Sequence, residues 1–199
     1  MWYIIRLAII LMIVTGISAG ALSLVNLQTR PVIEEYKKQQ QAAARAEVME
    51  EGRVFVLRDS MSALPYYEVY SNEDTTGLIG YIFTAEGVGY ASTLVTVTGV
   101  DTAFNIQGIK ITSQQETPGL GAKCMEVRYG EDDPWFQRQY FKDWRLESGM
   151  KPLYAMTVAV DKDGGEIHSI TGATITGRVI SNSIKESAKE LKAKLEEGE

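Results

Sequence analysis

The string Thr171-Gly172-Ala173-Thr174, near the carboxyl end of the chain, presents hydroxyl groups beside two small residues. Gly172 and Ala173 leave open space around the hydroxyl of Thr174, so a large reactant can approach it. The sequence that follows is typical of a helix, whose first N–H groups are unpaired and favour a phosphate. The string therefore suits covalent attachment of a phosphate-bearing cofactor. A Gly-Ala turn before an ordinary helix N-cap uses the same residue types, and this alternative stays open on the string alone.

Two side chains after this turn fall within the first turns of the expected helix. Thr176 provides another hydroxyl, and Arg178 is four residues after Thr174, so its guanidinium can point back at a phosphate on Thr174. A solvated surface arginine is the alternative for Arg178.

A second string accompanies the first, and the two together resemble a known family. This second string is Glu116-Thr117-Pro118-Gly119-Leu120-Gly121. With one apolar segment at the other end of the chain, the pair resembles the G subunit of Rnf complexes and the C subunit of sodium-pumping NADH:quinone reductases. In those proteins the last Thr of a [Ser/Thr]-Gly-Ala-Thr motif carries FMN through a phosphoester bond. The resemblance covers nearly the whole chain and assigns that role to Thr174.

The resemblance also places the second string near the flavin. Pro118 fixes one backbone dihedral, Gly119 and Gly121 permit close backbone approach, and Leu120 offers an apolar contact. Lys123 follows this loop and is expected to help bind ribityl or phosphate oxygens, with a solvated lysine as the alternative. An ordinary turn would use the same residues without a flavin.

One position departs from the family pattern. The family usually has an Asp six residues before the modified Thr, and this chain has His168 there, with Glu166 two positions earlier. Because that Asp is thought to assist the flavin transferase, the departure bears on the modification reaction. It leaves Thr174 as the expected attachment residue.

The composition excludes several classes of protein. The 199-residue chain carries a net charge of −6, which provides no basic surface for nucleic acid. Its single cysteine, Cys124, excludes an intrachain disulfide and a cysteine-ligated metal or iron–sulfur site, and is expected to be a buried hydrophobic residue. The single histidine excludes a multi-histidine metal site. Redox chemistry must therefore come from an organic cofactor.

Residues 7–25 contain no charge and would be about 28 Å long as a helix, which roughly matches the hydrocarbon core of a membrane. Trp2 and Tyr3 are placed as interfacial aromatics. A signal peptide cleaved near Ala19-Gly20-Ala21 is the alternative, but the apolar run continues past that point. We expect an uncleaved single-pass anchor in contact with lipid. The family resemblance implies a cytoplasmic N-terminus and a flavin domain outside the cytoplasmic membrane.

The periodicity of the remaining sequence predicts an α+β fold. Residues 1–30 are assigned to the cytoplasmic tip and anchor, 31–51 to a helical linker that starts at Pro31, and 52–199 to an FMN-binding domain. Alternating apolar residues between turn signals predict a mainly antiparallel sheet with strands near residues 54–57, 66–70, 77–83, 94–100, 109–111 and 153–160. A C-terminal amphipathic helix is predicted from Ile180, Ile184, Ala188, Leu191 and Leu195.

The resemblance implies a covalent-FMN electron carrier that is not catalytic alone. It would be a subunit of a membrane complex coupling ferredoxin/NAD electron transfer to Na⁺ or H⁺ translocation. Its partners would be the other membrane and peripheral subunits, and a flavin transferase during maturation. The alternatives are a subunit of the quinone-reductase type and a membrane-tethered assembly module without flavin. A free-standing enzyme with Thr174 as nucleophile lacks a nearby base other than His168.

Overall fold

The computed structural model describes residues 2–58 and 64–197, and the chain divides into two compact units, Met1–Gln40 and Gln41–Glu199. Helix α1 (Trp2–Val48) continues through Pro31. The prediction that a separate helix starts at Pro31 is therefore wrong. Proline removes one helical hydrogen bond, but strong helix formers lie within four residues on both sides, among them Leu27, Gln28, Glu34 and Glu35, and the helix is maintained.

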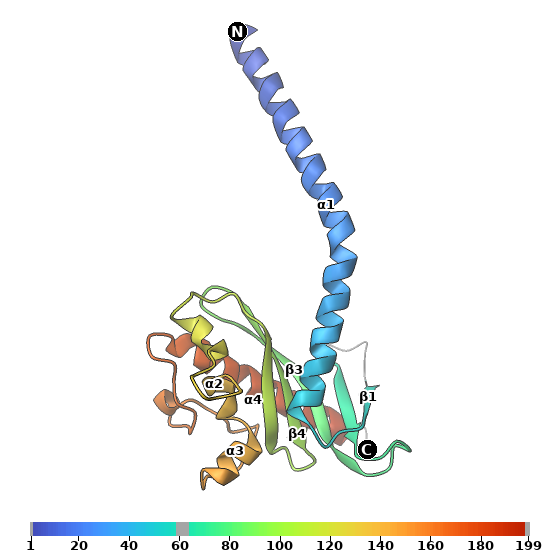
Figure 1. Cartoon of the computed structure of the whole chain (residues 1–199), viewed down its shortest axis with the longest axis vertical. Coiled ribbons are helices and arrows are strands. Elements are labelled where there is room, and N and C mark those ends of the chain that lie inside the picture. The colour runs from blue at the N-terminus through green and yellow to red at the C-terminus, as the bar shows by residue number, and fades with distance from the viewer. Residues whose placement is uncertain (1, 59–63, 198–199) are drawn as a thin grey trace. The chain divides into compact units, whose positions relative to one another are not determined.

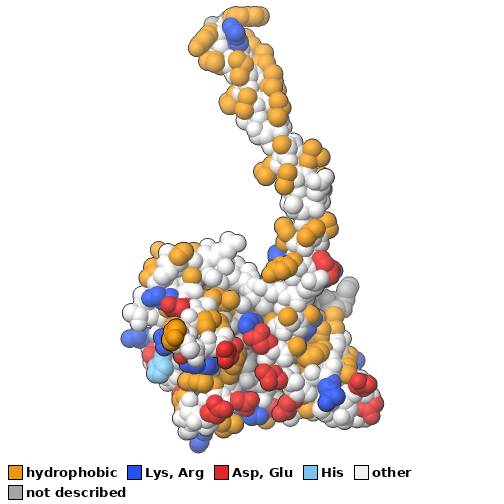
Figure 2. Space-filling view, in the orientation of Figure 1, with side chains coloured by type: hydrophobic (Ala, Val, Ile, Leu, Met, Phe, Trp, Pro, Cys, Tyr) orange, Lys and Arg blue, Asp and Glu red, His pale blue; other side chains and the backbone are white. Residues whose placement is uncertain are grey.

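The first unit exposes apolar side chains along α1 (Figure 2). Among the described residues, α1 is the one helix long and apolar enough to cross a membrane. Two hydroxyl groups within the apolar segment donate to backbone carbonyls of their own helix. Thr15 Oγ1 donates to Leu11 O at 2.9 Å, and Ser18 Oγ donates to Val14 O at 2.8 Å. These two hydroxyl groups are therefore hydrogen-bonded within the helix and can lie in a hydrocarbon region that offers no hydrogen-bond partner.

The second unit is built on the predicted antiparallel sheet (Figure 1). Its five strands pair in sequence order as a meander: β1 (Val54–Arg58), β2 (Tyr66–Tyr70), β3 (Leu78–Val88), β4 (Thr93–Asp101) and β5 (Ile106–Ser113). The α+β fold class is confirmed. Alternation along β4 sends Leu94 and Val100 to one face and Val97 to the other, because successive side chains of a strand point to opposite sides.

The first face of the sheet is covered by α4 (Thr174–Glu197), which packs against β3 and β4. Ile180, Ile184, Ala188 and Leu191 are fully buried, and Leu195 packs at the edge of the same core. The predicted amphipathic helix is thus present. Since it starts at Thr174, the sheet fixes the position of the turn that precedes it.

The second face receives the end of α1. Ala44 and Val48, followed by Met49, are buried against Val69, Ile82 and Val97. Gly99 makes this contact possible, because a Cβ there would lie 2.7 Å from Met49 Cγ and 2.8 Å from Val48 O. Residues 41–49 therefore contribute to the core of the second unit.

The remaining chain is irregular, with short helices α2 (Trp135–Arg138) and α3 (Lys142–Glu147) and the 3₁₀ turns η1 (Gly121–Met125) and η2 (Asp161–Asp163). The strand predicted over residues 153–160 is wrong. Tyr154 and Val160 form only isolated bridges, to Asn105 and Ile167. Leu153, Ala155, Val158 and Val160 are buried in the main core, whereas Tyr154 is 38% exposed, so the burial does not follow the alternation of a single strand.

Candidate cofactor site

A cavity of about 480 Å³ lies at the start of α4, where the two sequence strings meet. In Figure 1 this is the region where η1 lies beside the first turn of α4, two elements that are in contact. The cavity is lined by predicted site residues from both strings, namely Glu116, Thr117, Leu120, Gly121, Gly172, Ala173, Thr174 and Thr176. Tyr90 and Ile175 complete its wall. The structure therefore brings together segments that are more than fifty residues apart in the sequence.

The turn before α4 is compact. Gly172 adopts φ +80°, a conformation that favours glycine, and Ala173 N donates to Ile170 O at 2.9 Å. Thr174, half-buried, begins the helix, and no acidic side chain is in the first helical turn. The first N–H groups of a helix lack partners within it, and the positive end of the helix dipole is at this end, beside the cavity.

Glu116 ties three segments of the site to one another. Its Oε1 accepts from the backbone N–H groups of Ala91 at 3.0 Å and Ser92 at 3.1 Å, and from Ser92 Oγ at 3.2 Å. Its Oε2 accepts from Thr176 Oγ1 at 2.9 Å. The carboxylate thus joins the β3–β4 hairpin and its own loop to α4.

The environment of Glu116 favours its ionised form. The residue is only 6% exposed, and this burial alone would raise the pKa of the carboxyl group. The hydrogen bonds from Ala91, Thr176 and Ser92 outweigh burial, so the pKa is lowered overall. Glu116 is therefore a carboxylate at neutral pH.

Two glycines enclose this carboxylate. A Cβ at Gly89 would lie 2.6 Å from Glu116 Oε1, and a Cβ at Gly121 would lie 2.6 Å from Oε2 and 2.7 Å from Thr176 Oγ1. Gly121 is thus needed because any side chain would displace the carboxylate. This is a packing reason for the second glycine of the loop, additional to the predicted approach of a ligand.

The hydroxyl groups of the turn differ in availability. Thr176 is 1% exposed and bonded to Glu116, whereas Thr174 is partly exposed and lines the cavity. Thr171 is exposed and lines a neighbouring cavity of about 530 Å³ together with Lys123, Trp135 and Trp144. Thr174 is therefore the threonine of the string that is at the start of the helix, lines the 480 Å³ cavity and is partly exposed.

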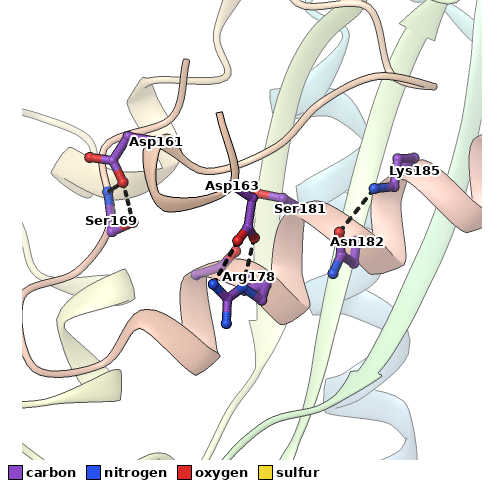
Figure 3. A network of polar contacts seen from close by, with 8 residues as sticks. Asp161, Asp163, Ser169, Arg178, Ser181, Asn182 and Lys185 are labelled. Atoms are coloured by element: carbon purple, nitrogen blue, oxygen red, sulfur yellow. Dashed lines mark hydrogen bonds and ion pairs between the residues drawn. The ribbon is translucent and has the colours of Figure 1, made fainter. Parts of the chain in front are cut away.

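The other predicted residues lie further from this cavity. Pro118 and Gly119 form the exposed tip of the loop, with Gly119 at φ +76°. Arg178 is turned toward Asp163, to which its Nε and Nη2 both donate at 2.6 Å (Figure 3). These hydrogen bonds lower the pKa of Asp163 and raise that of Arg178. His168, at the departure from the family pattern, is exposed, with Nδ1 3.9 Å from Asp161 Oδ2.

Sequence reasoning missed Tyr90, Ser92 and Ile175. Tyr90 is 77% exposed at the β3–β4 connection and reaches the cavity from a segment that carried no motif. Ile175 lies between Thr174 and Thr176, and its apolar side chain was not considered as a cofactor contact. The short run Gly89-Tyr90 between two predicted strands was the available signal, since binding residues are often on loops that a rigid scaffold positions.

Comparison with known proteins identifies the family. Residues 89–189 match the family model described as FMN-binding domain, and residues 3–48 match the model described as RnfG N-terminal region. The G subunit of an ion-translocating oxidoreductase complex from Pasteurella multocida is 30% identical over 203 residues, covering 96% of this chain and 92% of the relative. The chain belongs to the RnfG family.

A second RnfG relative, the G subunit of the Na⁺-translocating ferredoxin:NAD⁺ oxidoreductase complex of Acetobacterium woodii, is 28% identical over 92% of this chain and 88% of its own length. Among solved structures, the NqrC of Shewanella oneidensis gives a TM-score of 0.43 at 22% identity, covering 65% of this chain and 61% of that chain. The two family matches show that the chain has an FMN-binding domain, and with the exposed apolar helix α1 and its relatives in membrane complexes it is a membrane protein.

The cavity has the features that FMN requires. Leu120, Ile175 and the Tyr90 ring offer apolar surface for a planar ring system, and the free N–H groups at the start of α4 suit a phosphate. The volume lies in the range of ordinary small-molecule sites. The residues present therefore fit FMN.

Proposed function

We propose that this RnfG protein is a covalent-FMN electron carrier in a membrane complex that couples electron transfer between ferredoxin and NAD to translocation of Na⁺ or H⁺. The names of its relatives support the complex, and the family match supports the flavin. When bound, the FMN would supply one- and two-electron redox chemistry. The protein would not be catalytic alone, because the donor and acceptor belong to other subunits.

The attachment would be carried out by a flavin transferase using FAD and magnesium. The Thr174 oxygen would attack the FMN phosphorus of FAD, forming one P–O bond while the pyrophosphate P–O bond breaks and AMP leaves. The hydroxyl proton would pass to a base of the transferase. The contribution of this chain is an accessible hydroxyl, since Gly172 and Ala173 leave its approach open.

The observation that carries this proposal is the contrast between Thr174 and Thr176. Thr176 Oγ1 is buried and donates to Glu116 at 2.9 Å, so its use as the acceptor would require that bond to be broken and the helix start to be exposed. Thr174 lines the cavity at the first position of α4. Its phosphoester would meet the free N–H groups of that turn.

Other predicted residues would act around this linkage. Thr117, Leu120 and Gly121 would line the flavin, whereas Lys123 and Thr171 would approach the phosphate or ribityl chain from the neighbouring cavity. Arg178 would reach the phosphate only by giving up contacts with Asp163. Gly119 and Pro118 would shape the loop tip.

The proposal includes a topology. The anchor would cross the cell membrane once with a cytoplasmic N-terminus, and the flavin domain would lie on the extracytoplasmic side. The anchor would comprise residues 1–30, the linker 31–51 and the FMN-binding domain 52–199, although residues 41–49 already pack with the domain. Lipid and the other subunits would be its partners in the membrane.

Intact-mass spectrometry tests the proposal. The full chain, produced with an active flavin transferase and purified in detergent, should carry one added FMN unit. Thr174→Ala should abolish the addition, and the matched variant Thr176→Ala should retain it. An unmodified parent chain would favour the assembly-module alternative. Co-purification with a quinone reductase in place of a ferredoxin-linked complex would favour the other subunit type.

A further inference from the structure

Tyr90 is an exposed aromatic side chain on a backbone that is held in place. Its side chain is 77% exposed, yet the residues around it are fixed by four hydrogen bonds. Gly89 N donates to Ser92 O at 2.8 Å, and Ala91 N, Ser92 N and Ser92 Oγ all donate to Glu116. A large ring is thus exposed to solvent on a tip that is held in place. Exposure of its apolar surface to water is unfavourable, and no core contact offsets it.

The Tyr90 ring has a defined place relative to the attachment residue. It lines the same cavity as Thr174, together with Leu120 and Ile175, which are 45% and 49% exposed. Three large apolar groups therefore surround one cavity and remain uncovered in the protein alone. A flat aromatic ligand with two apolar faces would cover them together, which an aliphatic or purely anionic ligand would not do.

We infer that Tyr90 stacks on the isoalloxazine ring of the flavin carried by Thr174. This inference rests on the proposed function and adds to it the position of the isoalloxazine ring. Glu116 acts as a positioning residue, since its carboxylate holds both the tip that bears Tyr90 and the helix start that bears Thr174. The two ends of the bound flavin, phosphate and ring, are thereby set by one side chain.

Stacking has a spectroscopic consequence. A phenol in contact with an excited flavin donates one electron to it and recovers that electron as the pair relaxes, so the fluorescence is quenched without net chemistry. An electron-rich ring on one face also favours the oxidised flavin over the more negatively charged reduced form. Tyr90 is therefore expected to lower both the emission and the midpoint potential of the attached flavin.

The test uses the full chain, loaded by the transferase and purified in detergent. Mass spectrometry first establishes that each variant carries flavin, which separates failure of this inference from failure of the proposed function. Tyr90→Ala should raise flavin fluorescence several-fold and shift the potential upward. Tyr129→Ala is the matched control, because Tyr129 is fully exposed and does not line the cavity. Equal emission from the two variants and the parent overturns the inference.

Two further variants keep the test decisive. If Tyr90→Ala accepts no flavin, Tyr90→Phe retains the ring but is a poorer electron donor, so its emission should still rise and an unchanged value refutes stacking. If the flavin ring lies instead in the neighbouring cavity, Trp135→Phe rather than Tyr90→Phe should raise the emission. That result would also overturn the inference.

Discussion

Replacement of Glu116 by Gln should weaken the domain in a way that depends on pH. The substitution keeps the size of the side chain and removes its charge. The new amide oxygen can still accept from Ala91 and Ser92, but its NH₂ group faces Thr176 Oγ1, which donates to the carboxylate in the parent protein. The Thr176 hydroxyl must therefore rotate so that its oxygen accepts.

The magnitude follows from the number and type of these bonds. Hydrogen bonds to a charged acceptor contribute roughly 1.5–3 kcal/mol each and neutral ones roughly 0.5–1.5 kcal/mol. The gains are not additive over one carboxylate that serves several donors. Loss of the charge should thus cost about 2 kcal/mol of unfolding free energy at pH 7.

The pH dependence gives the sharper test. Because the pKa of Glu116 is lowered in the folded protein from the ordinary value of 4.5, its contribution is fully present above that pH and is lost as pH falls through the folded pKa. The parent and Glu116→Gln should therefore differ at pH 7 and converge as the pH falls from 4.5 through the lowered pKa of the folded protein.

Urea titrations of the full chain in detergent, followed by the fluorescence of Trp135 and Trp144 in a Trp2→Phe background, measure this difference. Glu126→Gln is the matched control, since Glu126 is exposed and should show no such gap. A gap that is constant from pH 7 to pH 3, or equal in the control, would refute the role assigned to the carboxylate.

Two more predictions concern the core. Gly99→Ala places a Cβ 2.7 Å from Met49 Cγ. Overpacking of this kind costs about 1–3 kcal/mol, so amide hydrogen exchange over residues 41–48 should accelerate. The control substitution Thr102→Ala should leave this exchange unchanged. Unaltered exchange in Gly99→Ala would argue against the helix end being held by this glycine. Cys124 is fully buried, and burial raises the pKa of its thiol to about 12, so the protonated thiol should not react with a disulfide reagent at pH 8 until urea unfolds the domain. Rapid labelling of the folded protein would contradict this.

Most of the sheet and the C-terminal helix could be predicted, because their signals are local. Alternation between Gly, Pro and Asn boundaries marks β2 and β4, and the spacing of Ile180, Ile184 and Ala188 marks α4. The burial of Val48 was not predictable in this way. It depends on Gly99, a residue in β4 whose missing side chain matters only once the sheet has formed. The strand predicted at residues 153–160 is wrong because the apolar residues of this irregular segment are buried in the core without pairing to a neighbouring strand.

The meeting of the two strings was predicted through the family resemblance, whereas the contacts that hold them together were not. Glu116 bonds to residues 24 and 60 positions away, and no pattern within one segment reveals such pairs. For the same reason Tyr90 was missed, since its place beside Thr174 follows from the β3–β4 hairpin folding over the loop. Motifs therefore predicted the candidate groups, and the tertiary hydrogen bonds show how Glu116 and Thr176 are held.

This distinction changes the interpretation of Glu116. It was predicted as a cofactor contact, but both of its oxygens already accept from protein donors, and Gly89 and Gly121 close the space beside it. Oε1 accepts three of these hydrogen bonds and Oε2 accepts one, so the carboxylate is bound mainly by donors of the protein itself. Thr117, Leu120 and Gly121 also line the cavity from this loop, and they are the residues that we propose contact the flavin. We infer that Glu116 fixes the shape of the site by holding the segments around it. A substitution of Glu116 should therefore change the environment of the flavin more than it changes the amount attached at Thr174.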